Sequence, residues 1–375
     1  MTAPRLEIDL DKIYHNAFSL VEKLAPSGIA VTGVTKATLG SPEIADAMLR
    51  AGVSAIGESR IENIEAMHLA GMLAPMTLIR SPMLSQVDRV ITHADVSFHT
   101  ELAVISKFSI AAQRARRLHG IVIMVELGDL REGVMPNDLM NIVRETLRFP
   151  NVVFKGIGTN LACRSGVSPD ARNMAELSAI ADSIEARFGL AVEIVSGGNS
   201  ANLQWALSGT DTGRINDLRL GESILLGRET LHRHLIEGLH TDAITLVAEV
   251  IESNVKPSLP WGNIAQNAFG EKPSAVNRGH ISQAILAIGR QDVDASGLQP
   301  PPDIEILAAS SDHLIVKSGC DSLPVGIEIP FQLNYSALVG AMTSPFVAKV
   351  LKSQNGYVSV PTNSRSRSVK CRRSY

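Results

Sequence analysis

A lysine at the end of an apolar run is the first residue in the chain with the potential for covalent chemistry. Lys36 directly follows IAVTGVT (29–35), a run with the composition of a buried strand. An amine between apolar neighbours loses part of its hydration, and this favours the neutral form that attacks carbonyl groups. The alternative is a surface lysine whose stem lies along apolar neighbours. The place of Lys36 at a strand end favours the nucleophile.

Two glycine-rich segments could hold a phosphate group. In SGGNSANL (196–203), Gly198 allows the backbone to approach a ligand, and Ser200 offers a hydroxyl at the expected start of a helix. In LRLGESILLG (218–227), Gly221 and the amides beside it form a second loop of this kind. Either segment alone is a weak signal because glycines mark turns in every protein. The two together predict an anion site.

Other loops carry residues that could contact a substrate or move a proton. The guanidinium of Arg131, in MVELGDLREG, suits a carboxylate, although an ion pair with Asp129 or Glu132 is an equal alternative. Asn160 and Cys163 follow the run VVFKGIG. A lone cysteine is most often a small buried side chain, whereas at a site it could act as a proton carrier.

The last third of the chain contributes four further candidates. They are Asp292, the neighbouring pair Asp312 and His313, and Tyr335. Each of them, taken singly, is more typical of a structural role. We find no histidine or cysteine cluster with metal-ligand spacing and expect no metal site.

Eight short apolar runs, alternating with helical patterns, would position these residues. Helical spacing over 41–52, 100–117 and 168–189 separates some of the runs, and Ser41 and Ser168 are the expected helix starts. Runs that are apolar throughout are typical of parallel strands covered on both faces. The eight runs are 29–35, 53–57, 76–80, 95–98, 120–126, 152–158, 192–196 and 215–220.

This alternation predicts an α/β fold, a (β/α)8 TIM-type barrel with its chemistry at the carboxyl ends of the strands. A doubly wound open sheet is the alternative, but its GxGxxG signature after the first strand is absent. We assign residues 1–240 to the barrel. Residues 241–352 carry β-rich runs between proline- and glycine-rich turns, which predicts a separate β domain. Residues 353–375 are polar and rich in arginine and serine, and we expect a disordered tail.

The overall composition narrows the class of protein. The chain has 375 residues, and 35 basic side chains nearly balance 38 acidic ones, which argues against a nucleic-acid-binding protein. No apolar run reaches the ~18 residues of a membrane span, and the N-terminus lacks a signal-peptide core. Three scattered cysteines make no disulfide framework. We therefore expect a cytoplasmic protein without nucleic-acid or membrane partners.

The motifs together resemble the alanine racemase-like family of fold type III enzymes, which depend on pyridoxal 5′-phosphate (PLP). The resemblance covers about residues 5–350. It implies that Lys36 carries PLP, that Arg131 holds a substrate carboxylate and that Arg219 faces the cofactor's ring nitrogen. It further implies cofactor contacts from Asn160, Gly198, Ser200, Gly221, Glu222 and Tyr335. The motifs that carry it are IDLDKIYHN, VTKA, VELGDLREG, GGNSAN, LRLG, AILAIGRQD and YSALVGAMTSP.

Several segments are similar to the ornithine and lysine racemase branch of that family, among them GESRIEN, IRSPML, KPSLPWG and ASSDHLIV. They imply that the small-molecule substrate is a basic amino acid whose L and D forms are interconverted. The second proton carrier stays open between Asp292, Cys163 and His313, and Asp292 is also a candidate for binding the substrate. The resemblance further implies a homodimer whose active sites are shared between the two chains.

Two departures from the family pattern keep other functions open. Asn160 stands where alanine racemases place a histidine over the cofactor ring, and NIAQNAFG, with Asn267 and Phe269, stands where they place a catalytic tyrosine. The alternatives are an alanine racemase, a D-threonine aldolase or D-serine dehydratase, a PLP-binding protein without turnover, and a degenerate racemase.

Overall fold

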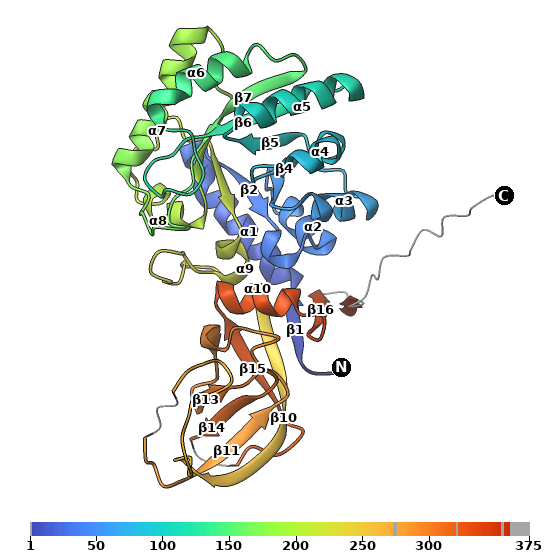
Figure 1. Ribbon diagram of the computed structural model, residues 1–375, viewed down its shortest axis with the longest axis vertical. Coiled ribbons are helices and arrows are strands. Elements are labelled where there is room, and N and C mark those ends of the chain that lie inside the picture. The colour runs from blue at the N-terminus through green and yellow to red at the C-terminus, as the bar shows by residue number, and fades with distance from the viewer. Residues whose placement is uncertain (1, 273–275, 320–321, 354–355, 361–375) are drawn as a thin grey trace, which may run out of the picture. The chain divides into compact units, whose positions relative to one another are not determined.

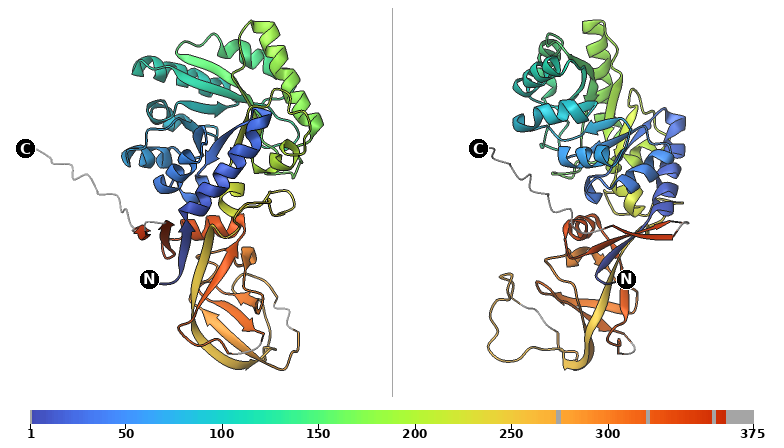
Figure 2. Two further views of the ribbon diagram at one scale, coloured as in Figure 1. Left: turned by 180° about the vertical axis from the view of Figure 1, so that it is seen from behind. Right: turned by 90° about the vertical axis from the view of Figure 1, so that its right-hand side faces the viewer.

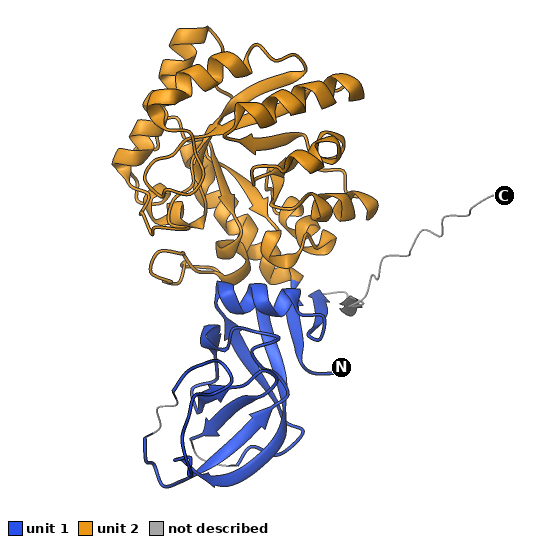
Figure 3. Cartoon of the chain, in the orientation of Figure 1, with its two compact units in different colours: residues 1–9, 244–375 blue, residues 10–243 orange. Residues whose placement is uncertain are grey.

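A computed structural model describes residues 2–272, 276–319, 322–353 and 356–360. The chain forms two compact units, Leu10–Ala243 and a second made of Met1–Asp9 with Ile244–Tyr375 (Figure 3). The expected boundary after residue 240 lies within a few residues of this division. We had assigned the first nine residues to the barrel, whereas the structure groups them with the second unit.

The first unit is a closed barrel of eight parallel strands, as predicted (Figure 1). The barrel closes where the last strand pairs with the first, with Asp217 opposite Ala30 and Arg219 opposite Thr32. The strands are β2 (Ala30–Val34), β3 (Ala55–Glu58), β4 (Met76–Leu78), β5 (Val96–His99), β6 (His119–Met124), β7 (Val152–Gly158), β8 (Ile194–Gly198) and β9 (Asp217–Leu220).

Helices surround this barrel in all three views (Figures 1 and 2). They cover the outer faces of the strands, and this explains why all six residues of β6 are buried and why residues 120–124 carry no polar side chain. Among the described residues, no helix combines the length and the apolar character required to cross a membrane. The helices are α1 (Leu10–Leu24), α2 (Pro42–Arg50), α3 (Ile61–Leu69), α4 (Val87–His93), α5 (Leu102–Ala115), α6 (Pro136–Thr146), α7 (Ala171–Phe188), α8 (Leu203–Ala206) and α9 (Glu222–Leu226).

Local capping decides where these helices begin. The Ser41 hydroxyl accepts a hydrogen bond from the amide of Ile44 and starts α2, as expected. Helix α7 begins three residues after the expected Ser168. Asp170 and Asn173 form a reciprocal capping box there, which satisfies two amide donors and outcompetes the serine.

The second unit is a mainly antiparallel β structure, and its described residues include the helix α10 (Tyr335–Thr343). Its strands follow the order β13-β14-β11-β10-β1-β16-β17, and β15 pairs with β10 and β12. The N-terminal strand β1 is held between β10 and β16, which explains why it belongs to this unit. The strands are β1 (Arg5–Asp9), β10 (Ile244–Pro257), β11 (His280–Leu286), β12 (Leu298–Gln299), β13 (Ile304–Ala309), β14 (Leu314–Ser318), β15 (Glu328–Leu333), β16 (Ala348–Ser353) and β17 (Gly356–Val360).

The tail that we expected to be disordered from residue 353 is partly ordered. Ser353 ends β16, and residues 356–360 form β17, which pairs antiparallel with β16. The polar composition of this segment concealed a strand whose partner lies next to it in the chain. Residues 361–375 of the expected tail lie outside the described residues.

A buried histidine pair lies between the barrel and α5. The Ser97 hydroxyl lies 2.7 Å from Nε2 of both His99 and His119. Phe108 of α5 packs against both imidazole rings. Burial away from water lowers the pKa of His99 to about 3 and that of His119 to about 4, so both rings stay neutral inside the fold.

We expect this pair to make the barrel sensitive to acid. In the unfolded chain the histidines have a pKa of about 6.5, so below that pH they bind protons that the folded chain does not bind. The stability present above about pH 6.5 is therefore lost as the pH falls. The expected loss between pH 7 and pH 5 is about 2 kcal/mol for each histidine. Urea unfolding across this range measures it. His119→Asn should remove about half of the loss, and the exposed His280→Asn should leave it unchanged. If the free energy of unfolding fell equally with pH in His119→Asn and in the wild type, the assignment would be contradicted.

Candidate active site

Lys36 lies just beyond the carboxyl end of β2. The strand ends at Val34, and Lys36 begins the short turn 36–38. We expected a desolvated lysine, but Lys36 is exposed, because the chain has left the strand two residues before it. The residue before it is fixed: Thr35 is fully buried, and its hydroxyl donates to Glu58 over 3.1 Å. The side chain of Lys36 therefore projects from a firmly held backbone.

Glu58, at the carboxyl end of β3, is the buried acid that holds this backbone. Its carboxylate also accepts the amides of Ser59, over 2.6 Å, and of Arg60, over 3.3 Å. Burial raises the pKa of Glu58, and these hydrogen bonds oppose that effect. Our sequence reasoning missed Glu58. Its one signal was its place at the end of an apolar strand.

Arg219 is buried inside the barrel near the carboxyl ends of β7, β8 and β9. One guanidinium nitrogen donates to the Ser196 hydroxyl, and the other to the carbonyl of Thr159 over 2.7 Å. The guanidinium carbon lies 5.1 Å from the centre of the Phe98 ring. Burial lowers the pKa of Arg219, but a guanidinium keeps its proton in proteins, so a permanent positive charge sits at this place.

Asp217 supplies the opposite charge through an intermediate hydroxyl. Ser196 donates to one oxygen of Asp217 and receives the bond from Arg219, so it links the two. Thr32 of β2 donates to the other oxygen over 2.6 Å. Asp217 and Arg219 lie two residues apart in β9, so their side chains point to the same face of the strand, the inner one. This chain of bonds connects the closing strand of the barrel to β2 and β8.

Asn160 and Cys163 lie in the loop after β7, beside Arg219. The amide oxygen of Asn160 accepts from Asn199 over 3.1 Å and from Arg219 over 3.3 Å. Its amide nitrogen is buried and has no hydrogen-bond partner among the described residues. Asn199 also donates to the sulfur of Cys163 over 3.5 Å, and Cys163 is exposed. A buried donor without an acceptor is costly, and this position suits a ligand atom that accepts.

The two glycine-rich loops meet at the ends of β8 and β9. The hydroxyls of Ser200 and Ser223 lie 3.0 Å apart, and the amide of Ser223 donates to Ser200 over 3.2 Å. Gly198 has φ +144°, and an added Cβ would lie 2.2 Å from the side-chain oxygen of Asn202. At Gly221, a Cβ would lie 3.0 Å from the carbonyl oxygen of Val34. The structure thus brings Ser200, Gly221 and the end of β2 together.

Glu222 follows Gly221 and forms an ion pair with Arg233. The side chain of Glu222 is 13% exposed, and burial raises its pKa to about 7. The positive charges of Arg233 and Lys36 act in the opposite direction and lower the pKa. Lys36 follows the end of β2 and Glu222 follows the end of β9, and these strands pair in parallel, so both groups lie at the same end of the barrel.

Arg131 lies in a loop that a buried carboxylate organises. Glu126 accepts the amides of Gly128 over 2.6 Å, Leu130 over 3.0 Å and Arg131 over 3.2 Å. Arg131 is exposed, and its guanidinium pairs with Glu132, which is one of the alternatives that we weighed from the sequence. This pairing raises the pKa of Arg131, with a smaller influence from Cys163.

Asp129 ties this loop to the one that carries Cys163. Its fully buried carboxylate accepts the amides of Arg164 over 3.0 Å and Ser165 over 2.9 Å. The sequence suggested Asp129 only as an ion-pair partner of Arg131. Both carboxylates, Glu126 and Asp129, serve instead to shape loops, and sequence reasoning missed that role.

The remaining candidates belong to the second unit and are described within it. Asp292 accepts from the Ser344 hydroxyl over 2.8 Å, and His313 Nδ1 lies 2.8 Å from Asp312. Tyr335 begins α10. Asn267 accepts the amides of residues 269 and 271 and so builds a turn.

The family model for the N-terminal domain of alanine racemase matches residues 8–228. The chain belongs to this family. It is 39% identical to a lysine racemase of Thermotoga maritima and 38% identical to an ornithine racemase of Acetoanaerobium sticklandii, each over 93% of this chain and 99% of the relative. The structure superimposes on a D-threonine aldolase of Filomicrobium marinum with a TM-score of 0.75 at 15% identity, covering 97% of this chain and 96% of that one, which shows a shared fold alone.

We expect Glu126→Ala to loosen the loop that carries Arg131. Three amides lose their acceptor, and each buried unsatisfied donor costs about 1–3 kcal/mol before water replaces the carboxylate. Hydrogen exchange at residues 128, 130 and 131 should become faster. Glu126→Gln keeps one acceptor oxygen and should show a smaller change. Glu145→Ala, at a half-buried residue of α6, should show none. If hydrogen exchange at these amides were unchanged in Glu126→Ala, the loop would be shown to keep its conformation without the carboxylate.

Proposed function

We propose that this chain is a PLP-dependent racemase that interconverts the L and D forms of lysine or ornithine. The observation that carries the proposal is its 38–39% identity, over nearly the whole of both chains, to a lysine racemase and an ornithine racemase. The shared fold does not distinguish a racemase from an aldolase, because the D-threonine aldolase has it too. The sequence relatives therefore decide the reaction class.

The barrel residues fit the cofactor. Asn160 has a buried donor that lacks an acceptor, and Arg219 stands next to it with a fixed charge. A ring nitrogen and a phenolic oxygen, both present in PLP, are acceptors of the kind that these two groups require. Ser200 and the amides near Gly221 and Glu222 would hold the phosphate, with Tyr335 as a further ligand. Lys36 is exposed at the same end of the barrel and would form the covalent link.

PLP, when bound, withdraws electrons from the substrate's Cα and so weakens its bond to hydrogen. The amine of Lys36 takes or returns the proton on one face of Cα. Arg131 would release Glu132 and bind the substrate carboxylate in its place. Arg219, permanently charged, would disfavour a second positive charge beside it, so it would keep a ring nitrogen bound at that place unprotonated. This restricts electron delocalisation and limits side reactions.

A second group must serve the opposite face of Cα. Cys163 is the candidate within the barrel, where it is exposed and contacts Asn199. Asp292 and His313 are the candidates from the second unit, and Asp292 is also a candidate for the substrate's distal ammonium. Because the charged side chain of lysine or ornithine requires a carboxylate or carbonyl lining, an acidic residue suits that place.

The working unit that we propose is a cytoplasmic homodimer with shared sites. The second unit exposes large apolar side chains along one stretch of chain: Val255 is 68% exposed, Trp261 82% and Ile264 56%. A stretch of this kind is typical of an interface.

The racemase proposal predicts activity with L-lysine or L-ornithine and less with L-alanine, measured by chiral chromatography over a panel of amino acids. Lys36→Ala should lower the rate by roughly 10²–10⁴-fold and remove the visible absorbance of bound cofactor. The exposed Lys107→Ala is the matched control and should change neither. An aldolase or dehydratase would instead lose activity with a chelator. Retention of cofactor bound covalently in Lys36→Ala would contradict the assignment of that lysine.

Shared sites predict complementation between two inactive chains. Lys36→Ala is mixed with an inactive variant of Asp292, His313 or Tyr335 under conditions of subunit exchange. Half of the dimers are then hybrids with one intact site, so activity should return to about a quarter of the wild-type value. Native mass spectrometry verifies the exchange. Proven exchange without recovered activity, or a fully active monomer, would exclude the shared site.

A further inference from the structure

The segment after α9 forms a small hairpin with three possible metal ligands at its tip. Arg228 and Leu235 form an antiparallel bridge, and the amide of Glu229 donates to the carbonyl of His234 over 3.0 Å. The turn between them has the sequence ETLHRH, so Glu229, His232 and His234 all project from six consecutive residues. Side-chain donors from so short a segment converge without a long loop closure.

Glu229 is a buried carboxylate held in a fixed orientation. It accepts the amides of Leu231 over 2.7 Å, His232 over 3.0 Å and His234 over 2.8 Å. Burial works to raise the pKa of Glu229, but these amides outweigh burial and keep it below its ordinary value. The His232 amide also lies 3.1 Å from the second oxygen, so each oxygen receives two amide contacts, and the direction of the carboxylate is fixed.

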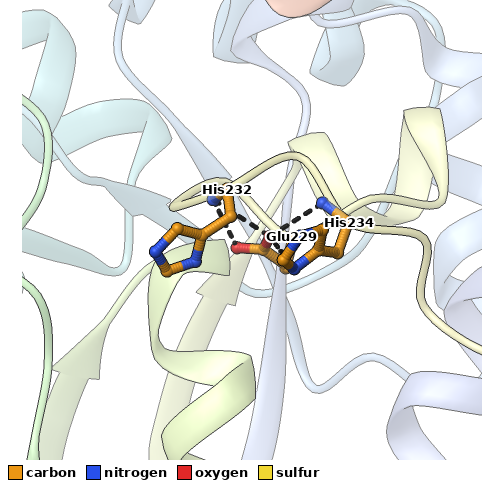
Figure 4. Close-up of side chains that lie close together, drawn as sticks. All are labelled: Glu229, His232 and His234. Atoms are coloured by element: carbon orange, nitrogen blue, oxygen red, sulfur yellow. Dashed lines mark hydrogen bonds and ion pairs between the residues drawn. The ribbon is translucent and has the colours of Figure 1, made fainter.

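The two imidazoles lie beside this carboxylate (Figure 4). One donor atom from each of the three residues lies within 4.8 Å of the other two. His234 Nδ1 is 3.6 Å from the nearer Glu229 oxygen, which is too long for a hydrogen bond. Two ligands of one tetrahedral ion, each about 2.1 Å from it, are separated by about 3.4 Å. The spacing of these two atoms therefore suits a shared ion better than a direct bond.

We propose that this hairpin binds a zinc-class divalent ion through Glu229, His232 and His234. Two imidazoles and one carboxylate are the donor set that such an ion prefers, whereas magnesium and calcium favour oxygen ligands. Water completes the coordination, because both histidines are exposed. The proposal concerns the hairpin alone and does not depend on the racemase activity.

The ion would act on the mouth of the barrel through Arg233. This residue lies between the two histidines with φ +65°, a conformation uncommon outside glycine, and it pairs with Glu222. Fixing both neighbours of Arg233 restrains its backbone and therefore the ion pair at Glu222. The inferred role of the metal is to order the hairpin and hold Arg233 in place. Arg233 is not a ligand, and its charge is already paired with Glu222.

Equilibrium dialysis of the chelator-treated holoenzyme against zinc chloride tests the site. We expect one ion per chain, and a weakening of about tenfold or more in each of His232→Ala and His234→Ala. The melting temperature of the wild type should rise with zinc, and that of His234→Ala should not. The histidine variants are chosen because Glu229 builds the hairpin, and replacing it could disrupt the turn.

Two further variants separate this site from general zinc binding. His280→Ala removes an exposed histidine of the second unit and should leave the affinity unchanged. Arg233→Ala should bind zinc as tightly as the wild type, or more tightly, because it removes a nearby positive charge. Less than one ion per wild-type chain, or the same affinity in both hairpin histidine variants as in the wild type, would overturn the proposal.

Discussion

A permanent positive charge buried inside a closed barrel is the constraint around which this site is built. Removing a guanidinium from water costs several kcal/mol unless its donors are satisfied, and Arg219 meets Ser196, Thr159 and Asn160 at the ends of two neighbouring strands. The compensating charge of Asp217 lies on the same strand, which is also the strand that closes the barrel against β2. Barrel closure and the electrostatics of the site thus depend on the same four residues of β9. A change that weakened this pairing would expose the charge as well as open the barrel.

The sequence predicted the barrel well because its signal is local. Most strands are covered on both faces and appear as short, mainly apolar runs, and residues 120–124 of β6 are the extreme case. The strand β1 carried no such signal about its place: its partners β10 and β16 lie more than 230 residues away in the chain. Nothing in RLEID indicates which sheet it joins. Both Ser168 and Asp170 could cap the start of α7, and the reciprocal hydrogen bonds between Asp170 and Asn173 decide in favour of Asp170.

The candidate site was predictable in its exposed members and not in the groups that support them. Lysine and arginine at strand ends are conspicuous, whereas Glu58, Glu126, Asp129 and Glu229 resemble ordinary surface acids in the sequence. All four are buried and accept backbone amides of their own or a neighbouring loop. A carboxylate in this role needs no basic partner, because several amide dipoles stabilise its charge. Charge pairing along the chain, on which sequence reasoning depends, gives no indication of such groups.

These buried acids explain how the site combines rigidity with free side chains. Thr35 donates to Glu58, while Lys36, the next residue, is exposed. The amide of Arg131 donates to Glu126, while its guanidinium pairs with the neighbouring Glu132. In both cases the hydrogen bonds constrain the backbone and leave the long side chain to move. In the proposed reaction Lys36 would alternate between holding the cofactor and moving a proton, and Arg131 would exchange Glu132 for a substrate carboxylate. Both proposed roles require that freedom. Ionic pairing of Arg131 with Glu132 is weak at the surface, so the exchange costs little, whereas the amides that fix its position are retained. Buried carboxylates that fix the backbone, beside exposed side chains that can move, are therefore the arrangement that the proposed reaction requires.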